Sequence, residues 1–346
     1  MGYFRKTIEQ MAGYTSGFQP KIDNVVKLNT NENPWPCSPK VLEAIGNLTA
    51  EHLQKYPEAM GDRFRMAAAV VLSIESKNII CTNGGDDLLT ICFRAFCDAN
   101  RPVAFSEPTY SLYPVLANLQ GCEAIEIERD ENGSLDELAK IDAAMTIVCN
   151  PNAPTGDFIP VEKLATLAGQ LSGVLLIDEA YVDFAEDDAI WLIANFDNVI
   201  LLRSMSKGYS LAGIRFGYGI SDVELIDGLM KVKDSYNVDA MAIAAATAAI
   251  QDQPHLKMNV EKIKAERRRL VDELRSMGFE VANSETNFVL AASIKKSAKA
   301  VYELLVERNI FVRYFPLPGL EDKLRITIGT PQQNDKLLAA LKEIII

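Results

Sequence analysis

The sequence predicts an α/β fold with a mostly parallel central sheet in a large domain, plus a smaller α+β domain. Two observations lead to this prediction. Between residues 78 and 221, short apolar runs alternate with amphipathic stretches of helical period, which is typical of a sheet covered by helices on both faces. After residue 222 the alternation stops, and helices come first, followed by a mixture of strands and helices.

Seven short apolar runs predict the strands of the large sheet. They are Ile79–Thr82, Val103–Phe105, Ala124–Ile127, Thr146–Cys149, Val174–Ile177, Val199–Leu202 and Phe216–Ile220. Helical patterns lie between several of these strands, at Asp86–Phe96, Leu112–Leu119 and Val161–Leu171. Because helices connect consecutive strands, the strands are expected to run mostly parallel.

The remainder of the chain predicts a second, smaller unit. Its predicted helices are Val223–Lys233, Ala240–Ile250, Val260–Met277, Ala298–Glu307 and Pro331–Ile345, and its strands are Asn287–Ala291, Ile310–Arg313 and Leu324–Ile328. We interpret the charged run Glu266–Arg269 as an exposed helix face. The large domain is expected at residues 39–236 and the smaller one at residues 1–38 and 237–346, with Asn33–Pro39 as a linker.

Composition excludes several classes of function. The net charge of -12 disfavours nucleic acid as a partner, because binding to phosphate backbones requires clustered Lys and Arg. No apolar run reaches the ~18 residues that span a bilayer, and the charged N-terminus has no apolar signal core. The six cysteines lie in apolar stretches without CxxC spacing. A cytoplasmic protein with reduced cysteines and no membrane partner is therefore expected.

Histidine content restricts the chemistry further. Only His52 and His255 occur, which is too few for a histidine-rich metal site and argues against a Ser/His/Asp hydrolase. No metal site is expected. Acid–base chemistry is left to lysine, tyrosine or a carboxylate.

The first motif with chemical potential follows the predicted strand Val199–Leu202. Lys207 lies there beside Ser204, Ser206 and Gly208, with Arg215 eight residues on. Open α/β sheets keep their sites at strand ends. A desolvated lysine can present a neutral amine to an aldehyde, and two hydroxyls with a guanidinium suit a phosphate. Taken alone, however, such a lysine is usually a surface residue.

A second motif ends the strand Val174–Ile177, where Asp178 is followed by Tyr181. The carboxylate could keep a pyridine nitrogen protonated, and the tyrosine could bond a ring hydroxyl. Alone, Asp178 could equally be a helix cap or a Mg²⁺ ligand.

Three further turns follow predicted strands. Gly84 and Gly85 stand between a strand and a helix, where bare N–H groups can bind an anion. The run Asn150–Gly156 is rich in turn residues, and Pro108–Tyr110 offers an aromatic ring at a strand end. Each is weak evidence by itself, since glycine turns and core aromatics are common.

As a set, these motifs resemble the aspartate aminotransferase superfamily of pyridoxal-phosphate enzymes over nearly the whole chain. The ordered motifs are NGGDD, PTY, NPNAPTG, DEAY, SMSKGYSLAGIRFGY and LRITIGT. Within that superfamily the sequence is most similar to the histidinol-phosphate aminotransferase subfamily, through KLNTNENP at residues 27–34, Tyr56-Pro57 and YTSGFQP at residues 14–20.

The resemblance implies a fold-type-I pyridoxal-phosphate transferase that exchanges an amino group between histidinol phosphate and 2-oxoglutarate. Lys207 would carry the cofactor as a Schiff base, Asp178 would pair with the pyridine nitrogen, and Tyr181 would contact the ring oxygen. The other implied cofactor contacts are the ring-stacking Tyr110, the phosphate-binding Gly85, Asp86, Ser204, Ser206 and Arg215, and Tyr56 from the other subunit of a homodimer. The implied substrate contacts are Tyr14, Asn33, Arg313 and Arg325.

One position departs from the pattern of the superfamily. The asparagine that usually precedes Pro-Thr-Gly, and donates to the ring oxygen, is Ala153 here. Either Asn152 takes over this contact or Tyr181 acts alone.

Alternatives remain open within and outside this class. The implied anion sites for small anionic amine and 2-oxo acid substrates are also compatible with an aromatic amino-acid aminotransferase or a threonine-phosphate decarboxylase. A non-catalytic pyridoxal-binding regulator would carry a DNA-binding domain, for which the chain has no room. A nucleotide-binding protein would need GxGxxG or GxxxxGK, and neither motif occurs.

Overall fold

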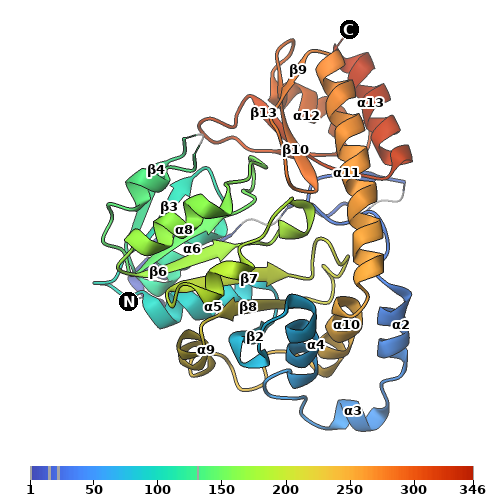
Figure 1. The fold of residues 1–346 in the computed structure, drawn as a ribbon. Helices are drawn as coiled ribbons and strands as arrows, with labels where there is room; N and C mark the ends of the chain where they lie inside the picture. The colour runs from blue at the N-terminus through green and yellow to red at the C-terminus, as the bar shows by residue number, and fades with distance from the viewer. Residues whose placement is uncertain (1, 15–16, 22–23, 131, 346) are drawn as a thin grey trace.

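The computed structural model describes residues 2–14, 17–21, 24–130 and 132–345. A seven-stranded sheet forms the centre of its larger part (Figure 1). The strand order is β2-β8-β7-β6-β5-β3-β4, with bounds β2 Ile79–Thr82, β3 Val103–Glu107, β4 Ala124–Glu128, β5 Met145–Cys149, β6 Val174–Asp178, β7 Val199–Ser204 and β8 Gly217–Ser221. Strand β8 pairs antiparallel with both of its neighbours, β2 and β7, and the other pairings in this sheet are parallel. The predicted mostly parallel sheet is therefore confirmed.

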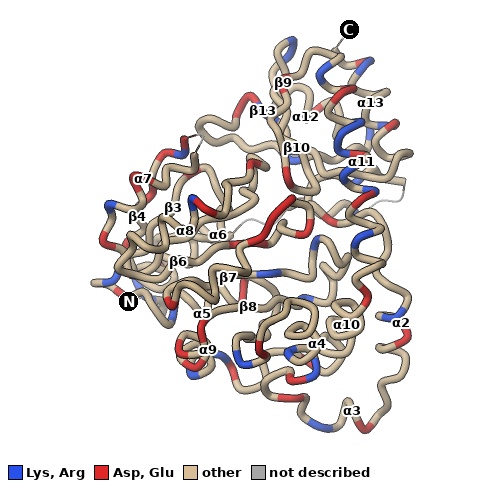
Figure 2. The backbone as a smooth tube through the Cα atoms, in the orientation of Figure 1, with Lys and Arg blue, Asp and Glu red and all other residues tan. Residues whose placement is uncertain are grey.

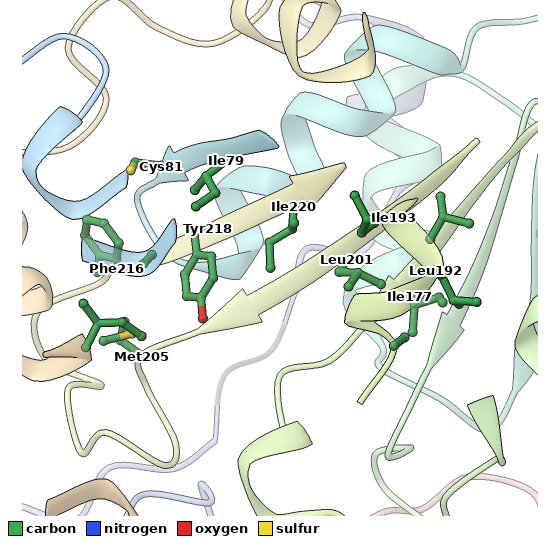
Figure 3. Close-up of a cluster of buried hydrophobic side chains, with 14 of the residues drawn as sticks. Ile79, Cys81, Ile177, Leu192, Ile193, Leu201, Met205, Phe216, Tyr218 and Ile220 are labelled. Atoms are coloured by element: carbon green, nitrogen blue, oxygen red, sulfur yellow. The ribbon is translucent and has the colours of Figure 1, made fainter. Parts of the chain in front are cut away.

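Burial explains why this sheet sits between two layers of helices. Every residue of β2, β5, β6 and β8 is buried, whereas the edge strand β4 exposes Glu126 and Glu128. Successive residues face opposite layers, so Ile79 and Ile80 belong to different apolar clusters. Figure 3 shows part of the first cluster, in which Ile177, Leu201 and other apolar side chains of the sheet pack together.

The helices of the larger part cover both faces of the sheet. They are α2 Pro39–Gly46, α4 Asp62–Leu72, α5 Gly85–Phe96, α6 Leu112–Gln120, α7 Leu135–Leu138, α8 Val161–Gln170, α9 Val223–Met230 and α10 Ala240–Ile250. Helices α5, α6 and α9 pack on one face, and α2, α4, α7, α8 and α10 on the other. The short helices α1 Lys6–Gln10 and α3 Ala50–Gln54 contribute no buried residue.

A four-stranded antiparallel sheet organises the C-terminal third. Its order is β12-β13-β10-β9, with bounds β9 Phe279–Val281, β10 Phe288–Ser293, β12 Arg313–Tyr314 and β13 Lys323–Thr327. Helices α11 Gln253–Ser276, α12 Ala298–Val306 and α13 Pro331–Ile345 pack around it. The N-terminal segment joins this unit, because β1 Val26–Lys27 pairs parallel with β11 Ile310–Phe311.

Helix α10 packs with the large domain, so it changes where the boundary between the two domains is drawn. Its buried side chains, among them Ala242 and Ile243, belong to the core of the large sheet, and the helix contacts α2 and α4. We propose that the large domain extends to residue 252, instead of ending at 236 as the sequence suggested. Residues 253–345 and the N-terminal segment would then form the smaller domain.

The basic run lies on α11, which carries several blue segments in Figure 2, and it is not exposed throughout. Arg267 is buried, donates to the carbonyl of Thr286 at 2.7 Å and pairs with Glu285 at 3.1 Å. Arg268 is exposed as predicted. The expectation was therefore wrong for Arg267, which ties α11 to the segment before β10.

Within the described part of the chain, no helix combines the length and the apolar character that a bilayer-spanning helix requires.

Candidate active site

The site lies where the parallel strands β5, β6 and β7 end together. Cys149 at the end of β5 pairs with Asp178 at the end of β6, and Asp178 pairs with Leu202 of β7. Because parallel strands share one carboxyl edge, the motifs that follow them converge at this edge. The turn after β7 carries Lys207 to the same place.

Lys207 is half-buried between the N-terminal segment and the Tyr181 ring. Its Nζ lies 3.4 Å from the carbonyl oxygen of Thr30 and 5.5 Å from the centroid of the Tyr181 ring. Burial lowers the pKa of the Lys207 amine to about 8, and the charge of Arg325 adds to the shift. A larger share of this amine is therefore neutral, and nucleophilic, near pH 7 than for an ordinary lysine.

Asp178 is buried at the end of β6. One carboxylate oxygen accepts from the hydroxyl of Tyr113 at 2.7 Å, and the other from the N–H of Ala180 at 3.1 Å. Burial raises the pKa of Asp178 to about 6, although both hydrogen bonds oppose the shift. Tyr113 was not predicted as a site residue, although it lies on α6 only three residues after the Pro108–Tyr110 turn.

Tyr181 follows β6 in a short turn and is also buried. Its ring meets Phe288 of β10 edge-on, with 5.2 Å between centroids. Its hydroxyl oxygen accepts a hydrogen bond of 2.8 Å from the side-chain amide of Asn31. Asn31 belongs to the KLNTNENP motif, and no individual role was predicted for it.

A candidate anion site lies at the N-terminus of α5. This helix begins at Gly85, so its first N–H groups are free of partners within the helix. Arg215 reaches the same place, 3.3 Å from Ser206 Oγ and 3.4 Å from Asp86 Oδ2. Ser204 ends β7, and its Oγ accepts from the N–H of Ser206 at 3.1 Å.

Glycine is required at two positions around this anion site. Gly84 has a φ of 85°, a conformation that side chains disfavour, and a Cβ on Gly217 would lie 2.6 Å from the backbone of Gly84. The close approach of β8 to the α5 N-terminus therefore depends on the absence of side chains. The Asp86 carboxylate meets Arg215 here, so a bound anion would take its N–H bonds from the helix and compete with Asp86 for Arg215.

Two tyrosines border the same space. The hydroxyl of Tyr110 donates to Asp86 Oδ1 at 3.2 Å. Tyr14, from the N-terminal arm, meets the Tyr110 ring edge-on, with 6.1 Å between centroids. Tyr14 is described, but Thr15 and Ser16 of the same predicted motif lie outside the described residues.

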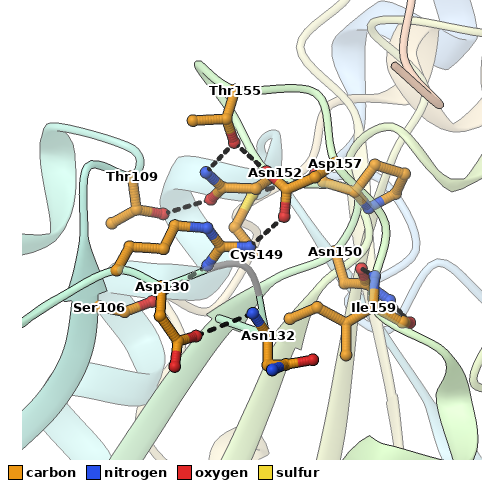
Figure 4. A network of polar contacts seen from close by, with 12 residues as sticks. Ser106, Thr109, Asp130, Asn132, Cys149, Asn150, Asn152, Thr155, Asp157 and Ile159 are labelled. Carbon is orange, nitrogen blue, oxygen red and sulfur yellow. Dashed lines mark hydrogen bonds and ion pairs between the residues drawn. The ribbon is translucent and has the colours of Figure 1, made fainter. Parts of the chain in front are cut away.

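The side chain of Asn152 is held in a polar network (Figure 4). Its Nδ2 donates to the carbonyl of Pro108 at 3.0 Å and to Oγ1 of Thr155 at 2.7 Å, and its Oδ1 accepts from Thr109 at 2.9 Å. Both amide hydrogens are therefore in use, and the geometry gives no support to Asn152 as a substitute for the asparagine replaced by Ala153.

Arg325 and Arg313 lie side by side on neighbouring strands of the smaller sheet, in register with each other. Arg325 donates to the carbonyl of Asn29 at 3.0 Å, and its guanidinium lies 5.2 Å from the centroid of Phe288. Its Nε is buried without a hydrogen-bond partner among the described residues. Burial lowers the pKa of Arg325, and the charge of Arg313 lowers it further. An anion bound here, in addition to one at the start of α5, would offset the repulsion between the two guanidinium groups.

Asn33 contacts the backbone of the Lys207 turn, and Tyr56 lies at the surface of the single chain. The side-chain amide of Asn33 donates to the carbonyls of Lys207 and Gly208, both at 3.1 Å, so it holds the lysine-bearing turn. Tyr56 is 80% exposed, and its ring stacks on Tyr236 with 4.5 Å between centroids. The chain alone thus brings most of the other predicted residues to this end of the sheet, but Asn152 is held in the network of Figure 4 and Tyr56 lies at the surface.

The sequence matches the family described as Aminotransferase class I and II over residues 23–341. The chain belongs to this family.

Relatives of this aminotransferase agree over its whole length. It is 47% identical to histidinol-phosphate aminotransferase 1 of Trichormus variabilis, over 99% of both chains. It is 42% identical to histidinol-phosphate aminotransferase of Citrifermentans bemidjiense, over 98% of both chains. Among solved structures, it superposes on histidinol-phosphate aminotransferase from Sinorhizobium meliloti in complex with pyridoxal-5'-phosphate, with a TM-score of 0.90 at 27% identity, over 100% of this chain and 98% of that one.

Proposed function

We propose that this aminotransferase uses pyridoxal phosphate to exchange an amino group between histidinol phosphate and 2-oxoglutarate, a step of histidine biosynthesis. The observation that carries the proposal is full-length identity of 47% to a histidinol-phosphate aminotransferase, in a chain whose strand ends present Lys207, Asp178 and Tyr181 together. Pyridoxal phosphate, when bound, supplies an aldehyde for amines and a ring that accepts electrons.

The described residues fit this cofactor. A phosphate suits the free N–H groups of α5, Ser206 and Arg215. The close approach of Gly84 and Gly217 leaves no side chain in the way. At the other end of the site, the buried carboxylate of Asp178 is suited to bond a pyridine N–H.

Each residue then has a defined task. The Nζ of Lys207 would hold the cofactor through its aldehyde carbon, and as a free amine it would carry a proton at the substrate α-carbon. A pKa near 8 suits both tasks, because neither the free amine nor the ammonium is rare near pH 7. The Asp178 carboxylate would hold a proton on the ring nitrogen of the cofactor and so would stabilise negative charge that develops at the reacting carbon.

The arginine pair is proposed to bind the substrate anion. Arg325 is fixed by Asn29 and by the Phe288 ring, while its Nε has no partner among the described residues. Arg313 stands next to it. A phosphate can engage both guanidinium groups, and a carboxylate can engage one of them in a two-point contact.

We further propose a homodimer, in which Tyr56 completes the phosphate site of the partner. Large apolar side chains are exposed around helices α2, α3, α4 and α10. They are Leu42, Leu53, Tyr56, Met66, Val70 and Met241. Such a patch on connected helices fits an interface with a second copy of the chain. A cytoplasmic location is also proposed, because all six cysteines are free thiols.

A panel of half-reactions tests the proposed substrate. Purified protein loaded with pyridoxal phosphate is mixed with histidinol phosphate, phenylalanine, tyrosine or threonine phosphate, and the cofactor absorbance is followed. We expect the fastest conversion with histidinol phosphate. Faster conversion of an amino acid without phosphate would refute the proposed substrate, and release of CO₂ from threonine phosphate would indicate a decarboxylase.

A further inference from the structure

A chain of hydrogen bonds leads from the backbone of the N-terminal segment to the hydroxyl of Tyr181. The N–H of Asn31 donates to Oγ1 of Thr327 at 3.0 Å. Thr327 Oγ1 donates to Oδ1 of Asn31 at 3.0 Å. The Nδ2 of Asn31 then donates to the Tyr181 hydroxyl oxygen at 2.8 Å. All three residues are buried, so water does not replace these partners.

The direction of this chain follows from its first member. A backbone N–H can only donate, so Thr327 Oγ1 accepts there and its single hydrogen is available for the oxygen of the Asn31 amide. That amide must then present its NH₂ group to Tyr181. The opposite amide orientation would aim two donors at Thr327 and leave the Thr327 hydrogen without an acceptor in this network.

The direction has a consequence for Tyr181. Because its oxygen accepts from Asn31, its own hydrogen is free to point elsewhere. The ring of Tyr181 borders the space that holds the Lys207 amine. The phenol therefore has a hydrogen to offer a ligand on that side.

The backbone around Asn31 is built to hold this arrangement. Asn31 has φ of 56°, a left-handed conformation that asparagine adopts more readily than most residues. Its carbonyl accepts from Nδ2 of Asn287 at 2.9 Å. Thr327 ends β13, and its N–H bonds the carbonyl of Leu28. The relay is thus anchored by two segments of the smaller domain.

We propose that Asn31 and Thr327 are positioning residues that fix the Tyr181 hydroxyl as a hydrogen-bond donor to the ring oxygen of the cofactor. This inference rests on the proposed function. Ala153, buried in the same apolar cluster as Tyr181, offers no side-chain donor. The relay therefore supplies, through Tyr181, the donor that a side chain at position 153 does not provide.

The relay has a spectroscopic signature. A donor to the ring oxygen stabilises its negative charge and weakens its hold on the proton shared with the Lys207 nitrogen. Loss of that donor should therefore raise the pKa of the colour change shown by the bound cofactor. For one hydrogen bond, the expected rise is about 0.5–1 unit.

The test titrates the visible absorbance of the loaded protein against pH. Thr327→Val keeps the shape of the side chain but removes the hydroxyl, and should raise the pKa of the colour change. Thr327→Ser retains the hydroxyl and should titrate like the natural protein. Asn31→Gly tolerates the left-handed backbone, removes the amide and should act like Thr327→Val, which keeps the test valid if one variant folds poorly.

A double variant separates a relay from a general disturbance. Tyr181→Phe should raise the pKa by itself, and adding Thr327→Val should then change nothing further, because the relay acts only through the phenol. The same additional shift in both backgrounds, or no shift in Thr327→Val and Asn31→Gly, would overturn the relay. Natural protein that binds no cofactor would overturn the proposed function and the relay with it.

Discussion

Burial shifts the pKa values of Lys207 and Asp178, the two titratable groups at the centre of the site, in opposite directions. It lowers the pKa of the Lys207 amine to about 8 and raises that of the Asp178 carboxyl to about 6. Both shifts favour the neutral form, because the low-dielectric interior disfavours charge. A protonated ring nitrogen beside Asp178 would reverse the second shift, so cofactor binding and the ionisation of Asp178 are expected to be coupled.

The raised pKa of Asp178 predicts how the stability of the cofactor-free protein depends on pH. Asp178 has a pKa above its ordinary value of 3.8, so the folded state holds its proton more tightly than the unfolded state. Its contribution is fully present below about pH 4 and is lost as pH rises through about 6. Asp178→Asn, which cannot ionise, should therefore be more stable than the natural protein at pH 7.5, by about 2–3 kcal/mol, and show little advantage at pH 4.

Urea denaturation of both proteins at the two pH values measures this difference. The cofactor must be removed from each sample beforehand. An advantage of Asp178→Asn that is equal at both pH values would contradict a raised pKa.

The sequence predicted these residues because their chemistry follows strand ends in short motifs. Lys207, Asp178 and Tyr181 each come within five residues of a predicted strand. Tyr113, Asn31 and Thr327 could not be assigned roles in this way. Their roles depend on contacts across the fold, such as the 65 residues between Tyr113 and Asp178 or the 296 between Asn31 and Thr327. The amide of Asn33 was expected to face substrate, and only the folded chain shows that it bonds the Lys207 turn.

At the scale of elements, the anion site depends on how closely β8 approaches the start of α5. A Cβ on Gly217 would lie 2.6 Å from the Gly84 carbonyl carbon and 2.7 Å from the Gly85 nitrogen. Gly217→Ala must therefore displace β8 or α5. We expect weaker retention of pyridoxal phosphate, at least tenfold, and a loss of about 1–3 kcal/mol in stability.

Gly213→Ala is the matched control for this prediction. Gly213 lies in the preceding turn, and a Cβ there meets nothing within 4 Å. Equilibrium dialysis against pyridoxal phosphate compares the two variants. Equal affinity would show that the contact between β8 and α5 does not shape the anion site.

Helix α11 is attached to the smaller sheet through one of its arginines. Arg267 is buried and bonds the segment before β10, whereas Arg268 next to it is exposed. Arg267→Ala leaves the Thr286 carbonyl without this donor and should cost about 1.5–3 kcal/mol in stability, and Arg268→Ala should cost almost nothing. Thermal unfolding of both variants checks the contrast, and equal losses would refute the assigned role of Arg267.

The same elements show why periodicity alone did not place every boundary. The pattern predicted α10 correctly as a helix but could not tell which core it joins, because an apolar helix of alanines fits either side. The strand β9 was not predicted, since Phe279–Val281 is only three residues long and takes its shape from pairing with β10. Buried strands such as β5 and β6 were predicted because burial on both faces demands a continuous apolar run.

For the whole molecule, the exposed Tyr56 predicts that each site needs both subunits. If Tyr56 serves the partner's phosphate site, Tyr56→Ala should weaken cofactor binding without changing the fold. A mixture of Tyr56→Ala and Lys207→Ala proteins should regain activity, because one site of each mixed dimer carries neither change. Random exchange of subunits should restore about a quarter of the natural activity.

Sedimentation and the activity of the refolded mixture measure these two properties together. A protein that is fully active as a monomer, or a mixture that gains no activity over its parts, would exclude shared sites.

The central claim is that Lys207 bonds pyridoxal phosphate, and covalent mapping tests it most directly. The loaded protein is reduced with borohydride, digested and analysed by mass spectrometry. The account predicts loss of the visible colour and one modified peptide, with the pyridoxyl phosphate group on Lys207, which is absent from Lys207→Ala. A label on another lysine, or an unlabelled Lys207 in protein that retains full activity, would contradict the account.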